Sequence, residues 1–174
     1  MLTIRHAEPR DVEALRELYG YHLVDVRHDE PRSAKLVMAD DAPTASTTIH
    51  RHLPLEKPLS EWCALLDELI DEPNYHLLVG NLDDRVVASV TLVVVRNLTH
   101  GLRPYALIEN VVTHSDFRKN GYAAALMAHA CELARKCDCY KVMLMTGSKK
   151  DSTLRFYESC GFSRHEKTAF VMRL

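Results

Sequence analysis

The fold of this chain is decided by residues 109–123, which read ENVVTHSDFRKNGYA. The apolar residues in the first part of this stretch are typical of a buried strand, and a helical pattern begins at Gly121. Arg118 and Lys119 place positive charge in the turn between strand and helix. Because the first N–H groups of a helix have no partner within it and the helix dipole is positive there, this turn predicts an anion site. Gly121 would let a phosphate approach the backbone closely, and Ala123 keeps the next turn small.

Outward from this stretch, the sequence predicts one mixed α/β domain over residues 1–174. The expected elements are a strand at 2–6, a helix from Glu8, a long loop at 25–58, a helix capped by Ser60, strands at 75–80, 85–96 and 105–114, a helix at 121–136, a strand at 140–146, a helix at 152–160 and a closing strand at 162–173. The buried stripe of the helix at 121–136 is expected to contain Tyr122, Leu126, Ala130, Leu133 and Cys137. Because that helix joins two strands, 105–114 and 140–146 should be parallel neighbours.

Composition indicates a soluble globular protein. The formal net charge of −2 favours neither nucleic acid nor a membrane surface as a partner. The N-terminus has no apolar stretch of signal-peptide length, and the most apolar run, 86–95, is too short to span a bilayer and fits a buried strand. The five cysteines have no zinc spacing, and the pair His50 and His52 is more typical of exposed loop histidines than of a metal site. We therefore expect reduced thiols, no metal and a cytoplasmic location.

Taken alone, the pattern Arg-x-x-Gly-x-Ala is also compatible with a plain strand-to-helix connection whose basic residues are solvated. Three segments together, however, resemble the GNAT superfamily of acyl-CoA N-acyltransferases. Residues 109–123 resemble the pyrophosphate motif of the family, and residues 141–145 resemble its next strand. Residues 154–162, which read LRFYESCGF, resemble its C-terminal signature. Order and spacing match from Ile108 to Phe162. Within the family, the resemblance is to the glucosamine-6-phosphate N-acetyltransferase branch, and the segments that carry it are 109–112, 139–142 and 156–162. Many small bacterial acetyltransferases of unknown acceptor share these motifs.

The resemblance implies a single-domain α/β fold with a mostly antiparallel central sheet, flanking helices, and a parallel strand pair that splays apart. It also implies acetyl-CoA as cosubstrate. The pantetheine arm would pair with the strand after Asn110, and a backbone N–H near Val111 would hold the oxyanion. Lys150 departs from the pattern, because many members place a CoA-contacting Asn there. The expected cofactor-binding residues are Val111, Val112, Thr113, Arg118, Lys119, Asn120, Gly121, Tyr122 and Ala123.

Two residues are the candidate catalytic groups. Glu109 lies mid-strand among apolar residues, where burial would raise its pKa, and it is the candidate general base, directly or through a water. An exposed strand glutamate is the alternative. Tyr157, by its position in the family signature, is the candidate acid that protonates the departing thiolate, and a packing aromatic beside Phe156 and Phe162 is the alternative.

The resulting hypothesis is acetyl transfer from acetyl-CoA to a primary amine of a small molecule by direct attack on the thioester. A protein or peptide N-acetyltransferase and a non-catalytic acyl-CoA sensor are the alternatives. The acceptor pocket is expected mainly from the segment 25–58, and a homodimer is compatible with the resemblance. Candidate acceptor contacts in or near that segment are His22, His28, His50, His52, Asp25 and Glu30.

Overall fold

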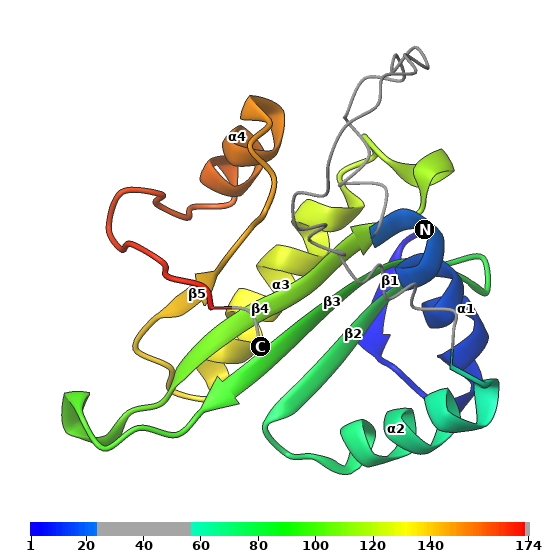
Figure 1. Ribbon diagram of the computed structural model, residues 1–174, viewed down its shortest axis with the longest axis horizontal. Coiled ribbons are helices and arrows are strands. Elements are labelled where there is room, and N and C mark those ends of the chain that lie inside the picture. Colours follow the sequence, from blue (N-terminus) through cyan, green and yellow to red (C-terminus); the bar gives the residue numbers. More distant parts are fainter. Residues whose placement is uncertain (24–56, 173–174) are drawn as a thin grey trace, which may run out of the picture.

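The computed structural model describes residues 1–23 and 57–172, and Figure 1 shows this part as a sheet flanked by helices. The described part forms one five-stranded sheet in which the strands lie in chain order, β1-β2-β3-β4-β5. Its strands are β1 (Thr3–His6), β2 (Tyr75–Leu82), β3 (Arg85–Val95), β4 (Tyr105–Thr113) and β5 (Val142–Leu144). Its α-helices are α1 (Val12–Glu17), α2 (Leu59–Asp71), α3 (Tyr122–Lys136) and α4 (Asp151–Ser159), and a π-helical turn, η2 (Leu18–Leu23), continues α1.

Strand direction changes at one edge of this sheet. β1 to β4 are antiparallel neighbours, whereas β4 and β5 are parallel, with Ala106 opposite Val142 and Ile108 opposite Leu144. The helix α3 is the crossover between them, as the sequence predicted. Pairing stops at Ile108 although β4 continues to Thr113, and the chain after β5 diverges from β4 towards α4 (Figure 1). The expected mixed sheet with a splayed parallel pair is therefore confirmed.

The two faces of the sheet carry separate hydrophobic cores, because successive strand residues point to opposite faces. On one face, Val90 and Leu92 of β3 pack with Leu126 and Met127 of α3. On the other face, residues of α1, η2 and α2 cover β2 and the end of β4. The predicted stripe of α3 was right at Leu126 and Ala130. Tyr122 and Leu133 are partly buried and pack against the same core, and Cys137 is partly buried. The fully buried Met127 and Ala134 also belong to the stripe and were not predicted.

Two local predictions were wrong, and one strand was predicted too long. The closing strand is absent over 162–172, where Phe170 to Met172 are exposed, because a strand needs a hydrogen-bonded neighbour and this segment has none among the described residues. Ser60 is not the cap of α2; it lies in the first turn of that helix, whose N-cap is Pro58. The strand expected at 140–146 is shorter, since it is paired only while β4 remains regular.

The apolar run 86–95 lies within β3, as predicted. Among the described residues, no helix is long and apolar enough to cross a bilayer. The expected acceptor contacts Asp25, His28, Glu30, His50 and His52 lie outside the described residues, as does the side chain of His22.

Candidate active site

An irregularity in β4 marks the centre of the candidate site. Across the β3–β4 ladder, Ser89 lies opposite Val112 and Thr91 opposite Glu109, so that Asn110 and Val111 together face one residue of β3. Asn110 has a left-handed backbone, with φ of 52°. This arrangement is a β-bulge, which bends the strand and takes one residue out of the ladder. The bulge lies at the place where the sequence analysis expected the oxyanion donor.

The two valines that follow Asn110 pack on opposite faces of the sheet. The side chain of Val111 packs against the core on the α3 face, whereas Val112 is buried in the core on the opposite face. Their side chains are thus committed to packing. A ligand beside them would use the backbone, as the sequence analysis expected for the pantetheine arm.

Glu109 immediately precedes the bulge and is half-buried. Burial raises the pKa of its carboxyl above the ordinary value. A raised pKa brings a carboxylate closer to the range in which it accepts a proton effectively near neutral pH. The environment predicted from its apolar neighbours in sequence is therefore the one that the fold provides.

Tyr157 lies on α4, half-buried against the core of the α3 face, with its ring centroid 5.1 Å from that of Phe156. Burial raises the pKa of its phenol, and the charges of Cys160 and Glu109 raise it further. The charge of Glu109 thus acts on Tyr157, although the two residues lie far apart in sequence. A phenol with a raised pKa is protonated at neutral pH and can donate its proton.

The turn before α3 has the geometry of an anion site. Gly121 is the N-cap of α3, its φ is 79°, and no side chain caps the helix from this position. A Cβ built on Gly121 would meet no atom of the described residues within 4 Å, so this part of the chain leaves the space above the turn open. Asn120 Nδ2 donates to the carbonyl oxygens of Phe117 (3.2 Å) and Arg118 (3.3 Å), which closes the turn. Arg118 Nε donates to the Thr113 carbonyl at 3.2 Å and ties the turn to the end of β4.

His114 is a structural residue of this region that sequence reasoning missed. It is buried, and its Nδ1 accepts a hydrogen bond from the Asp116 N–H at 3.3 Å. Arg85 Nη2 lies 2.9 Å from His114 Nε2, and the Arg85 guanidinium lies over the ring of Phe117. These contacts fix the chain between β4 and the turn. The signal was the position of His114 at the end of the predicted strand, but its partner Arg85 is supplied by a different strand.

Lys150, which departs from the family pattern, is the N-cap of α4 and is exposed. Its backbone N–H donates to Ser148 Oγ at 3.3 Å. The residue thus helps to begin the helix that carries Tyr157. Within residues 1–23 and 57–172, no group of three or more His, Cys, Asp or Glu side chains is placed to hold a metal ion.

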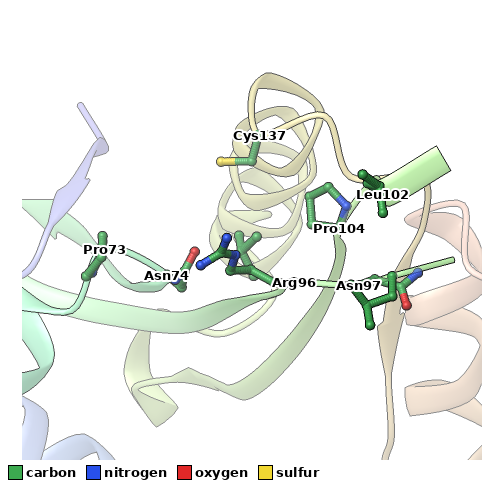
Figure 2. A pocket seen from close by; sticks show the side chains of 9 residues that line it. Pro73, Asn74, Arg96, Asn97, Leu102, Pro104 and Cys137 are labelled. Atoms are coloured by element: carbon green, nitrogen blue, oxygen red, sulfur yellow. The ribbon is translucent and has the colours of Figure 1, made fainter. Parts of the chain in front are cut away.

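A cavity of about 700 Å³ lies at the other end of the sheet, and Figure 2 shows the side chains around it. Its walls come from the chain before β2, the end of β3, the start of β4 and the end of α3, whereas the bulge and the turn lie at the far end of β4. It is therefore separate from the candidate site. The lining residues are Pro73, Asn74, Val94, Arg96, Asn97, Leu98, Leu102, Pro104 and Cys137.

A splayed parallel strand pair, a bulged strand and an open helix start define an acyl-CoA-binding type of fold, and comparison with known proteins agrees. Residues 37–162 match the Acetyltransferase (GNAT) family, so this chain belongs to that family.

Individual relatives support the same family. The chain is 39% identical over 83 residues to a glucosamine 6-phosphate N-acetyltransferase of Trypanosoma brucei brucei, a match that covers 48% of this chain and only 54% of that protein. It is 31% identical over 91 residues to a protein of the same name from Schizosaccharomyces pombe (strain 972 / ATCC 24843), covering 52% and 79% of the two chains. A solved structure from Agrobacterium tumefaciens str. C58 superposes with a TM-score of 0.73 and 34% identity, covering 99% of each chain.

Proposed function

We propose that this chain transfers the acetyl group of acetyl-CoA to a primary amine of a small-molecule acceptor. The observation that carries the proposal is the continuous segment from Glu109 to Ala123. It places a half-buried carboxylate, a strand bulge and an open helix start in succession along one stretch of chain. The proposed catalytic unit is the single domain formed by residues 1–174.

The proposed reaction has three proton and charge movements. The neutral amine attacks the thioester carbonyl, and the proton that the amine loses goes to Glu109, directly or through a water. The carbonyl oxygen gains negative charge, which a backbone N–H near Val111 stabilises. As the tetrahedral intermediate collapses, the carbon–sulfur bond breaks and the leaving thiolate takes a proton from Tyr157.

The turn before α3 would hold the pyrophosphate of acetyl-CoA. The N–H groups from Lys119 to Ala123 would surround the pyrophosphate in the open space beside Gly121, at the positive end of the helix dipole. Asn120 would act indirectly, by keeping the turn closed. Thr113 and Tyr122, at the two ends of this segment, would border the pantetheine arm and the pyrophosphate respectively.

The pyrophosphate assignment predicts the effect of Gly121→Val. A β-carbon at this left-handed position strains the backbone by about 1–2 kcal/mol, and the added side chain would occupy the phosphate space. We expect the affinity for acetyl-CoA, measured by calorimetry, to fall by at least about tenfold, which corresponds to about 1.4 kcal/mol.

Gly101→Val is the matched control for this variant. Gly101 also has a left-handed backbone, with φ of 69°, and open space around its Cβ position, but it lies in the β3–β4 connection. Both variants should lose similar thermal stability, and only Gly121→Val should lose affinity. Equal affinity in the two variants would remove the pyrophosphate assignment.

An amine screen tests the reaction itself. Two relatives are named glucosamine 6-phosphate N-acetyltransferase, which supports an amino sugar phosphate as the first acceptor to try. With acetyl-CoA and a panel of glucosamine 6-phosphate, other small amines and peptide N-termini, we expect release of free CoA with at least one small amine. Turnover with peptides alone would overturn the small-molecule assignment. Binding of acetyl-CoA without turnover on any amine would indicate a sensor.

A further inference from the structure

Two buried hydroxyl groups and one partly buried hydroxyl group lie on the same face of the sheet as the proposed base. Ser89 and Thr91 are each 1% exposed, and Thr91 lies directly opposite Glu109 across the β3–β4 ladder. Residues opposite each other in an antiparallel pair point to the same face, with Cβ atoms about 4.5–5.5 Å apart. The third hydroxyl belongs to Tyr19 of η2, whose oxygen lies 3.0 Å from Ser89 Oγ. The side chain of Glu109 therefore has a buried threonine hydroxyl as its direct cross-strand neighbour.

The hydroxyl of Thr91 differs from the other two in its bonding. Ser89 and Tyr19 satisfy each other, and burial raises the pKa of Tyr19 to about 12, so that its phenol stays neutral. Thr91 Oγ1 is buried and has no partner within hydrogen-bond distance among the described residues, although its hydroxyl is close enough to the Tyr19 phenol to lower the pKa of that phenol against the larger effect of burial. A buried polar atom without a partner is costly, and such atoms in folded proteins generally serve a ligand, a water or a reacting group.

Glu109 is the group that this hydroxyl could serve. Its burial disfavours the ionised form of the carboxyl. A carboxylate that must hold one orientation while it accepts a proton benefits from a donor on its other side. A threonine side chain opposite it in the ladder can reach it directly or through one water.

We propose that Thr91 is a positioning residue for the base Glu109, its hydroxyl donating a hydrogen bond to the carboxylate directly or through a single bridging water. This inference rests on the proposed role of Glu109. In this arrangement Tyr19 and Ser89 bond to each other, and Thr91, whose hydroxyl can accept one hydrogen bond and donate another, directs its hydrogen to the carboxylate. Thr91 contacts neither acetyl-CoA nor the acceptor and acts only through Glu109.

Thr91→Val tests the proposal because it keeps the branched shape and removes the hydroxyl. We expect kcat to fall by about 10- to 100-fold, the factor for losing a hydrogen bond to a charged group, with KM for acetyl-CoA unchanged. The acidic limb of the kcat/KM profile should move to higher pH, because the lost donor favoured the ionised carboxylate. Thr91→Ser, which restores a hydroxyl, should recover most of the rate.

Two controls separate positioning from structure. Ser89→Ala removes a buried hydroxyl from the neighbouring residue pair of the β3–β4 ladder, on the same face of the sheet. Because the partner of Ser89 is Tyr19, this variant should lower the thermal midpoint of unfolding and leave the acidic limb of the kcat/KM profile in place. In a Glu109→Gln background, Thr91→Val should cause no further loss of kcat, since coupled residues are not additive.

The outcomes also distinguish this inference from the function on which it rests. If Glu109→Gln turns over normally, the proposed base is wrong. If Glu109→Gln is slow while Thr91→Val matches the unaltered protein in rate and pH profile, the base stands and the role of Thr91 is overturned. Equal further losses of kcat in both backgrounds would also overturn it, because they would mean that Thr91 acts independently of Glu109.

Discussion

Tyr157→Phe should reduce kcat by about 10²–10⁴-fold, the usual contribution of general acid catalysis. The substitution removes one hydroxyl and keeps the ring, whose packing against Phe156 and the core of the α3 face should be preserved. Affinity for acetyl-CoA should change little, because a single hydrogen bond contributes only about 0.5–1.5 kcal/mol net. Single-turnover measurements of CoA release, combined with calorimetric titration of acetyl-CoA, separate the two effects.

The pH profile gives a second reading of the same variant. Burial, with the charges of Cys160 and Glu109, raises the pKa of Tyr157, so the phenol remains a proton donor up to pH values above the ordinary tyrosine value of about 10. The loss of rate at high pH should therefore disappear in Tyr157→Phe. Tyr105→Phe is the matched control: this half-buried tyrosine begins β4, at the opposite end of the strand from the bulge. Normal turnover of Tyr157→Phe would mean that the thiolate leaves unaided or takes its proton from water.

The sequence predicted those parts of the fold that are encoded locally or by spacing. The helix predicted at 121–136, which the structure has at Tyr122–Lys136, follows from periodicity, and the parallel pairing of β4 with β5 follows from the helix that connects them. Glu109 and the turn before α3 were predicted for the same reason, since each is set by its neighbours in the chain. These elements need no information about a distant segment.

The parts that could not be predicted depend on distant partners. The bulge at Asn110 exists only in the register of β4 against β3, and nothing in 105–114 alone states that register. Thr91 becomes relevant only because that register places it opposite Glu109, and His114 becomes structural only through Arg85. The prediction of a closing strand at 162–173 was wrong although its local sequence pattern suits a strand, because no strand among the described residues pairs with it.

Glu109→Gln should also lower kcat/KM by about 10²–10⁴-fold at neutral pH, because the amide keeps the shape and loses the ability to accept a proton. The pH dependence should change in form as well. In the unaltered protein the rate rises as the carboxyl, whose pKa burial raises, becomes ionised. In the variant it should rise only as the acceptor amine loses its own proton in solution, so that the deficit narrows at high pH.

Glu109→Gln should at the same time alter the titration of Tyr157. The negative charge of Glu109 helps to raise the pKa of that phenol, so removing the charge should lower it and bring the high-pH decline to a lower pH. Glu132→Gln, in an exposed ion pair with Arg135 on α3, is the control and should leave both limbs in place. A Glu109→Gln profile parallel to that of the unaltered protein, with no shift of either limb, would contradict both the base assignment and the electrostatic link between Glu109 and Tyr157.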